Sequence, residues 1–230
     1  ADRAQVIQTH DINQSDRKLL IATGWLQEII KGWYMLVRPD VATGDTAAWY
    51  THFWDFVRVY LHHRFGDEYC LSAESSLDLH TENTTIPQQV IVIVKRGAGL
   101  RTLMYDTSLL LYTDIKHFPS DRVQSRGINI MSLPYALCKA SPSYFQRCPR
   151  DAELALRMIK SPADLSRTLI QYELKAAAAR LVGAYEFLND VNTATIIKND
   201  LLSVGLLITP ENPFQQKTPL LLSERIRSPI

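Results

Sequence analysis

The chain has 230 residues, 46% of them hydrophobic and 21% charged, a composition typical of a globular protein with one large domain or two smaller ones. Lys and Arg number 25 against 24 Asp and Glu, so the whole-chain charge favours no class of partner, and nucleic-acid binding would need a local basic patch. The longest β-branched run, Val90–Val94, is much too short to cross a bilayer, and we expect no contact with a membrane.

Residues 1–42 are expected to form a winged helix-turn-helix. Residues 4–9 have the pattern of a helical fragment, and a second helix starts at a cap provided by Asn13 or Ser15 and ends near Gly24. The stretch LQEIIKGWYMLVRP at 26–39 then predicts a two-stranded ribbon that turns at Lys31 and Gly32. A helix followed by a tight β-wing is the order found in the C-terminal half of a winged helix-turn-helix.

The second of these helices is the candidate recognition helix. Leu19, Leu20 and Thr23 are expected to face inward beside Ile12. The candidate DNA-binding residues are Gln14 and Ser15, which would reach bases, and Arg17, Lys18 and the wing-tip Lys31, which would contact phosphates. A merely solvated helix face is the alternative interpretation. Residues 1–40 hold five basic and five acidic side chains, so we expect a weak monomer that gains affinity as a homodimer.

Residues 43–206 are expected to form an α/β (α+β) module with a helical C-terminal part. Aromatic residues at helical spacing predict an amphipathic helix over 46–64. A short helix over 71–80 and strands over 89–96, 100–105, 109–113 and 127–131 follow, with Gly97-Ala98-Gly99 as the hairpin between the first two strands. Helices are expected over 133–139, 151–159, 162–172, 175–189 and 193–204. Four prolines in the last 21 residues make 207–230 a linker toward a further, catalytic domain.

No catalytic, cofactor or metal site is expected in the chain. It has no G-x-S-x-G elbow, and G-x-G at 97–99 does not continue into a nucleotide-binding loop. The histidines are scattered, and the adjacent His62 and His63 point about 100° apart on a helix. A divergent nucleotidyltransferase would need Asp106 and Asp114 to converge. The cysteines, Cys70, Cys138 and Cys148, have no disulfide or zinc spacing, which favours structural thiols and a cytoplasmic location.

Four segments follow one another along the chain: GWLQEIIKGWYMLVRPD, GDTAAWYTHFWDFVRVYLHHRFGDEYCLSAESSLDLHT, ARLVGAYEFL and ENPF. This ordered set resembles the amino-terminal region of one group of bacterial Fic family proteins. That region is in turn similar to AbiEi-type antitoxins, which begin with a winged helix. Fic proteins transfer AMP to target proteins through a signature H-P-F-x-x-G-N-G-R. Here Asn212-Pro213-Phe214 carries Asn in place of the signature His, and no glycine-rich loop follows.

The resemblance implies a regulatory fragment of a bacterial Fic protein, or a free-standing antitoxin that regulates transcription in a toxin–antitoxin system. By the resemblance, Gln14, Ser15, Arg17, Lys18 and Lys31 match recognition-helix and wing positions of winged-helix antitoxins, which bind their own promoter. The expected partners are DNA, together with a Fic domain in cis or a toxin-like protein in trans. The rival expectation is a protein-interaction module that selects targets for a Fic domain or restrains it.

Overall fold

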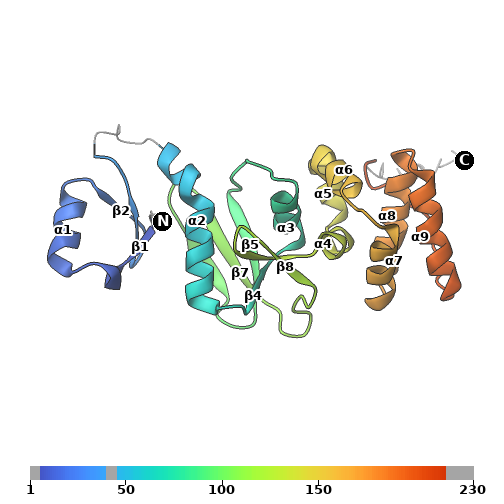
Figure 1. Ribbon diagram of the computed structural model, residues 1–230, viewed down its shortest axis with the longest axis horizontal. Helices are drawn as coiled ribbons and strands as arrows, with labels where there is room; N and C mark the ends of the chain where they lie inside the picture. The colour runs from blue at the N-terminus through green and yellow to red at the C-terminus, as the bar shows by residue number, and fades with distance from the viewer. Residues whose placement is uncertain (1–5, 40–45, 216–230) are drawn as a thin grey trace, which may run out of the picture. The chain divides into compact units, whose positions relative to one another are not determined.

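The computed structural model describes residues 6–39 and 46–215, which form an α/β fold of helices and mixed sheets (Figure 1). The chain divides into two compact units between Lys139 and Ala140, here called the N-terminal and the C-terminal unit. This division lies inside the range 43–206 that was expected as one module, and the boundaries expected at 42 and 206 stay predictions. The N-terminal unit contains β1 (Val6–Gln8), the 3-10 turn η1 (Thr9–Asp11), α1 (Gln14–Ala22), β2 (Leu26–Ile30), β3 (Trp33–Leu36), α2 (Ala47–Phe65), β4 (Tyr69–Leu71), α3 (Ala73–His80), β5 (Gln89–Val94), β6 (Gly99–Thr102), β7 (Ser108–Thr113), β8 (Arg122–Ser125), β9 (Ile128–Met131) and α4 (Leu133–Lys139).

The first sheet has the order β1-β3-β2, with both strand pairs antiparallel. The ribbon predicted around Lys31 is present as β2 and β3. The helix expected over residues 4–9 is wrong for its described part, because Val6, Ile7 and Gln8 pair with Met35, Tyr34 and Trp33 of β3. These backbone bonds to a strand nearly thirty residues away override the weak local helical pattern.

The N-terminal unit has one core around α2. The helix predicted here is present and most of its aromatic stripe is buried: Trp49, Phe53 and Phe56 are fully buried, whereas Tyr50 is 41% exposed. The three buried rings share a cluster with Val90, Val92 and Val94 of β5 and with alternate residues of β7, so α2 covers one face of the sheet that contains these strands. The same cluster contains Trp33 of β3, whose ring lies edge-on to Phe56 and Tyr60 at centroid distances of 5.9 and 5.5 Å. The first sheet is therefore joined to α2 by aromatic packing.

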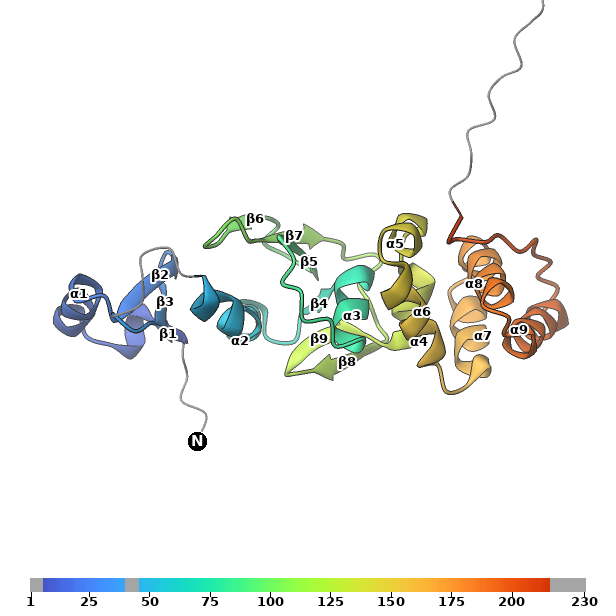
Figure 2. The same ribbon diagram turned by 90° about the horizontal axis from the view of Figure 1, so that it is seen from above.

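The second sheet has the order β4-β5-β7-β6 (Figure 2). β5 pairs with one edge of β7 in parallel, and β6 pairs with the other edge of β7 in antiparallel. The hairpin expected at Gly97-Ala98-Gly99 is wrong, because β7 lies between the two strands that this loop connects. The true hairpin joins β6 to β7, where Tyr105 and Asp106 have positive φ and Thr107 N donates to Met104 O at 3.1 Å.

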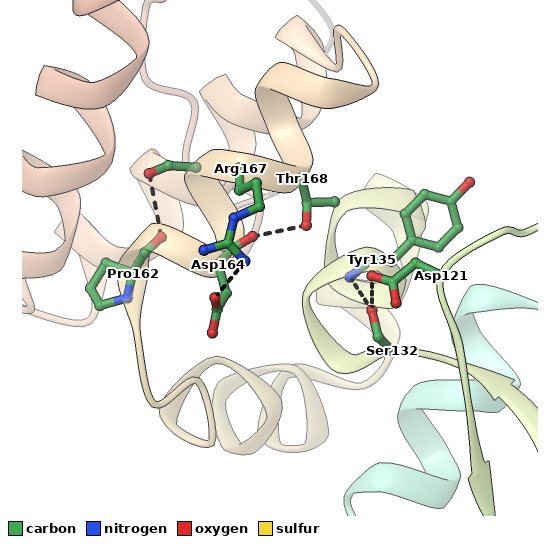
Figure 3. A network of polar contacts seen from close by, with 8 residues as sticks. Asp121, Ser132, Tyr135, Pro162, Asp164, Arg167 and Thr168 are labelled. Carbon is green, nitrogen blue, oxygen red and sulfur yellow. Dashed lines mark hydrogen bonds and ion pairs between the residues drawn. The ribbon is translucent and has the colours of Figure 1, made fainter.

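A third sheet consists of β8 and β9, after which the chain enters α4. Ser132 stands directly before α4 (Figure 3). Its Oγ donates to Asp121 Oδ2 at 2.5 Å and accepts a hydrogen bond from Tyr135 N at 3.4 Å. The hydroxyl thus satisfies one of the free N–H groups at the start of the helix.

The C-terminal unit contains the helices α5 (Pro142–Arg147), α6 (Pro149–Arg157), α7 (Pro162–Gln171), α8 (Lys175–Phe187) and α9 (Val191–Ser203). In α7, Arg167 Nη1 donates to Asp164 Oδ1 at 3.2 Å, and Thr168 Oγ1 donates to the Asp164 carbonyl at 2.8 Å (Figure 3). Buried leucines and an isoleucine of α7, α8 and α9 form the core of this unit, namely Leu165, Leu169, Leu181, Ile197 and Leu201.

Residues 206–215, the C-terminal strap, follow α9 and lie against α8. Glu211 N donates to Ala179 O at 3.0 Å, and Phe214 stacks on Phe187 with ring centroids 5.3 Å apart. The strap passes so close to Gly183 that a Cβ built there would lie 2.2 Å from Glu211 O. Residues 207–215 of the expected linker are therefore packed on the C-terminal unit, and the rest of that linker lies outside the described residues.

Candidate nucleic-acid interface

The polar end of α1 is built by its cap. Asn13 Oδ1 accepts a hydrogen bond from Asp16 N at 2.8 Å, so Asn13 is the N-cap and the helix starts at Gln14. Of the two caps that the sequence allowed, Asn13 and Ser15, the structure therefore uses Asn13. Gln14, Ser15 and Lys18 are all exposed. Because residues three and four positions apart share a helix face, these three side chains form one polar surface on the first turns.

Arg17 lies differently from the other predicted DNA-binding residues. Its side chain is only partly exposed, Nη1 donates to Thr9 O at 3.4 Å, and the guanidinium lies 5.9 Å from the centre of the Tyr34 ring. The first contact ties α1 to the 3-10 turn η1, and the second ties it to β3 of the first sheet. Arg17 therefore positions the helix, and it is the least available of the predicted phosphate contacts.

Lys31 is exposed at the tip of the β2–β3 hairpin, where Gly32 adopts φ of 85°. Glu28 Oε1 accepts a hydrogen bond from Gly32 N at 3.1 Å, and Gly32 O accepts one from Thr9 N at 3.0 Å. The hairpin tip is thus held from both sides. The carboxylate of Glu28 also lies in the same turn as Lys31 and reduces the positive potential there.

Acidic side chains near α1 serve as local hydrogen-bond acceptors. Asp11 Oδ2 accepts from Gln8 N at 2.7 Å, and Asp16 Oδ2 accepts from Asn13 Nδ2 at 2.6 Å. These two acids and Glu28 account for much of the neutral balance of this region. The sequence carries a signal for their role, since Gln8 and Asp11, and Asn13 and Asp16, stand three residues apart as in helix caps.

Apolar side chains of and beside α1 are unexpectedly exposed. The expectation that Leu19 and Thr23 face inward is wrong, because both are exposed, Leu19 over 61% of its surface. Ile21 is 44% and Trp25 47% exposed. The side of the helix nearest the sheet instead carries Arg17 and Leu20, which are partly buried, and Leu19 lies about 100° around the helix from Leu20. The helix contributes no buried residue.

The described part of this region contains one helix, α1, preceded by a single 3-10 turn. A helix-turn-helix has two helices, so the winged helix-turn-helix stays a prediction. The sheet order β1-β3-β2 and the position of α1 before the β2–β3 hairpin agree with the wing half of that motif.

Other candidate sites are not assembled. Asp106 precedes β7 and Asp114 follows it, so they lie at opposite ends of the strand and cannot share the metal ions of a nucleotidyltransferase. Among residues 6–39 and 46–215 no group of three or more His, Cys, Asp or Glu side chains could hold a metal ion. Nor does any helix in these ranges combine the length and apolarity that a membrane crossing requires.

No disulfide joins the three cysteines in the structure, and Cys70 and Cys138 are buried whereas Cys148 is partly exposed. Burial raises the pKa of the Cys70 thiol to about 12, outweighing the opposing effect of Arg122. Burial also raises the pKa of the neighbouring Tyr69. Cys70 is therefore kept in its unreactive protonated form.

No family model matches this sequence, and no curated protein matches it.

Proposed function

We propose that this chain is a regulatory module that binds DNA through residues 6–39 and a partner protein through the rest of the N-terminal unit. The observation that carries the proposal is the arrangement of α1 directly before the β2–β3 hairpin in a sheet of order β1-β3-β2. In winged-helix proteins this arrangement offers a helix to the major groove and a wing to the backbone. The exposed Gln14, Ser15 and Lys18 on α1 and Lys31 on the hairpin supply suitable side chains.

The affinity of one copy is expected to be low. Lys18 and Lys31 are the exposed cations among the predicted contacts, whereas Arg17 is partly buried, and Glu28 lies beside Lys31. Each phosphate contact contributes about 0.9 to the slope of log affinity against log salt, so two contacts give a slope near 2. Binding at useful concentrations therefore requires a dimer on two half-sites.

The test is a titration at low salt, read by fluorescence anisotropy, with a labelled duplex from the region upstream of the gene. The double variant Lys18→Ala/Lys31→Ala should weaken binding and lower the salt slope by about 0.9 for each contact. Lys160→Ala/Lys175→Ala removes the same charge from exposed positions of the C-terminal unit and should leave binding unchanged. Absence of binding to any duplex at low salt would refute the DNA function.

A protein-binding function for the same unit is supported by the open face of the second sheet. Ile91, Leu110 and Leu100 are cross-strand neighbours on β5, β7 and β6. On this face Ile91 is 39%, Leu100 53% and Tyr112 55% exposed, whereas α2 covers the opposite face. Parallel strand pairs are normally covered on both faces, and contiguous exposed apolar side chains are typical of interfaces.

We propose that this face binds a Fic domain in cis or a toxin-like protein in trans. Leu100→Lys should abolish co-purification of a co-expressed Fic domain, whereas Leu202→Lys, at a similarly exposed position of α9, should not. Light scattering distinguishes the alternative, in which the face joins two copies: Leu100→Lys would then convert a dimer to a monomer without any Fic domain present. If Leu100→Lys behaves like the original chain in both the co-purification and the light-scattering assay, the sheet face is not an interface.

A further inference from the structure

Two hollows, here together called the groove, lie along the side of α2 that faces the β8–β9 hairpin. Its first hollow, of about 200 Å³, lies between Tyr50 and Trp54 of α2, the loop after α3, and Arg126. The second, of about 400 Å³, lies between α2 and the β8–β9 hairpin and is lined by Arg58, Val59, His62, His63, Gln124 and Gly127. Tyr50, Trp54, Arg58 and His62 recur every four residues, so one stripe of the helix, roughly 18 Å long, forms a wall of both hollows.

Arg126 stands at the tip of the opposite wall in an unfavourable conformation. The hairpin pairs Ser125 with Ile128, so Arg126 and Gly127 are its two turn residues, with φ of 50° and 72°. Positive φ at both positions defines a type I′ turn, in which the first position favours Asn, Asp or Gly. A strained arginine in place of these residues indicates that its side chain serves something other than the turn.

The groove is lined by two arginines and one acidic side chain. Arg58 and Arg126 line it, together with His62 and His63, and Asp55 is the one acidic side chain among its lining residues. Asp55 is itself engaged by His52 Nδ1 at 3.4 Å. Across the described ranges neither Arg58 nor Arg126 makes a hydrogen bond or ion pair with another side chain. Two guanidinium groups facing a groove without partners favour an anionic occupant.

The side chain of Arg58 packs against Gly127 of the β8–β9 turn. A Cβ built on Gly127 would lie 2.9 Å from Arg58 Cδ, so the arginine stem runs over the glycine backbone. Glycine at the second turn position therefore both permits the turn and leaves room for Arg58. Arg126 lines the first hollow and Arg58 lines the second.

The backbone of β8 favours an extended chain as the occupant. β8 pairs with β9 on one side, and within the described residues no strand pairs with its other edge. Since Ser125 and Ile128 flank the two-residue turn, they exchange hydrogen bonds, and the N–H and C=O of Gln124 point to the free edge. An extended peptide of about six residues matches the length of the helical stripe.

We propose that the groove binds an extended acidic peptide of a partner protein, which adds as a strand to β8 and places carboxylates on Arg58 and Arg126. Trp54, Tyr50 and Val59 supply apolar surface for the alternate side chains of such a strand. The carboxylate of Asp55 and the small number of cations disfavour a nucleic-acid backbone. This site is separate from the DNA-binding surface proposed for α1 and does not depend on it.

The probe is a fluorescein-labelled peptide of about eight residues with alternating glutamate and valine, titrated with the full chain and read by anisotropy. Saturable binding is expected for this peptide and not for its lysine–valine counterpart. N-methylation of the alternate residues that would pair with β8 should weaken binding about tenfold or more, because it removes the backbone donors.

Arg126→Gly is the informative variant, because glycine accepts the positive φ and the fold is kept or stabilised. It should weaken peptide binding about tenfold, as should Arg58→Met, which keeps the apolar stem. Arg96→Ala, exposed at the end of β5, removes an equal charge and should leave binding unchanged. The proposal is overturned if no peptide binds, if Arg96→Ala is equally damaging, or if N-methylation has no effect. Displacement of the peptide by a single-stranded oligonucleotide that itself binds more tightly also overturns it, in favour of a nucleic-acid groove.

Discussion

Replacing Gly183 with alanine tests whether the C-terminal strap is packed on α8. In an isolated helix the change would stabilise by about 1 kcal/mol, because alanine is the better helix former. Here the new Cβ would lie 2.2 Å from Glu211 O and 2.4 Å from Glu211 C, and these are backbone atoms that no rotamer change can remove. The strap must move, and α8 must lose contact with it.

The size of the effect follows from what the strap contributes. Overpacking a close contact costs about 1–3 kcal/mol, and an obstacle made of backbone puts this change near the upper value. The hydrogen bond from Glu211 N to Ala179 O contributes about 1 kcal/mol, and each aromatic contact of Phe214, with Phe145 and Phe187, about 0.5–1.5 kcal/mol. After subtraction of the propensity gain, Gly183→Ala should lower the free energy of unfolding by about 2 kcal/mol.

The assay is urea unfolding followed by two probes. All four tryptophans, Trp25, Trp33, Trp49 and Trp54, belong to the N-terminal unit, so their fluorescence reports on that unit, and helical circular dichroism reports on both. Gly183→Ala should lower the urea midpoint of the C-terminal unit, which is seen in the circular dichroism signal, and should leave the midpoint of the tryptophan fluorescence unchanged. Ala176→Gly, exposed on the same helix, is the control for propensity and should cost about 1 kcal/mol.

A Gly183→Ala variant that is as stable as the original chain, or more stable, would mean that the strap does not pack on Gly183. A double-mutant cycle adds a second criterion. Phe214→Ala alone should be destabilising, but in the Gly183→Ala background it should cost much less, because the strap has already left its place. Simple additivity of the two changes would show that the strap tolerates the new methyl group.

Three further predictions concern stability in the N-terminal unit. Arg126→Asn should raise the free energy of unfolding by roughly 1 kcal/mol, seen as a higher melting temperature, since asparagine suits the first position of a type I′ turn; an unchanged or lower value would mean that Arg126 makes stabilising contacts. Asn13→Ala removes the cap of α1 and should cost about 1 kcal/mol, with faster amide exchange confined to that helix, whereas Asn13→Ser should restore most of the loss. Cys70 has a folded pKa of about 12 against 9.0 for the free thiol, so its contribution to stability is complete below pH 9.0 and is lost as the pH rises toward 12. Urea titrations over this pH range should show a steeper decline in the free energy of unfolding for the original chain than for Cys70→Ala. Equal slopes would contradict the raised pKa of Cys70.

Local patterns predicted the elements that depend on local forces. The stripe that includes Trp49, Phe53 and Phe56 is visible because helical periodicity is set within one segment, and Lys31-Gly32 marks its own turn. Local patterns did not predict strand pairs that are distant in the sequence. The residues around Gly97 do not indicate that β7 lies between β5 and β6, and those around Val6 do not indicate that β1 pairs with β3.

The candidate sites divide in the same way. Exposure of Gln14, Ser15, Lys18 and Lys31 followed from local amphipathicity and turn position, whereas the inward contacts of Arg17 depend on Thr9 and Tyr34 in three dimensions. The groove could not be predicted, since its walls come from α2 and from a hairpin more than sixty residues later. A reader of the sequence could still have noted Arg126-Gly127 as a two-residue turn between polar strand ends.

His63 takes part in two surfaces at once. It lines the groove beside α2, and its ring lies 5.5 Å from that of Trp33 and 6.2 Å from that of His10, both in the first thirty-nine residues. A peptide in the groove that displaces His63 therefore changes the packing of the first sheet, which carries α1, against α2. Thermodynamic linkage makes this coupling reciprocal: if a peptide in the groove changed the affinity of α1 for DNA tenfold, DNA would change the affinity for the peptide tenfold, which corresponds to a coupling free energy of about 1.4 kcal/mol.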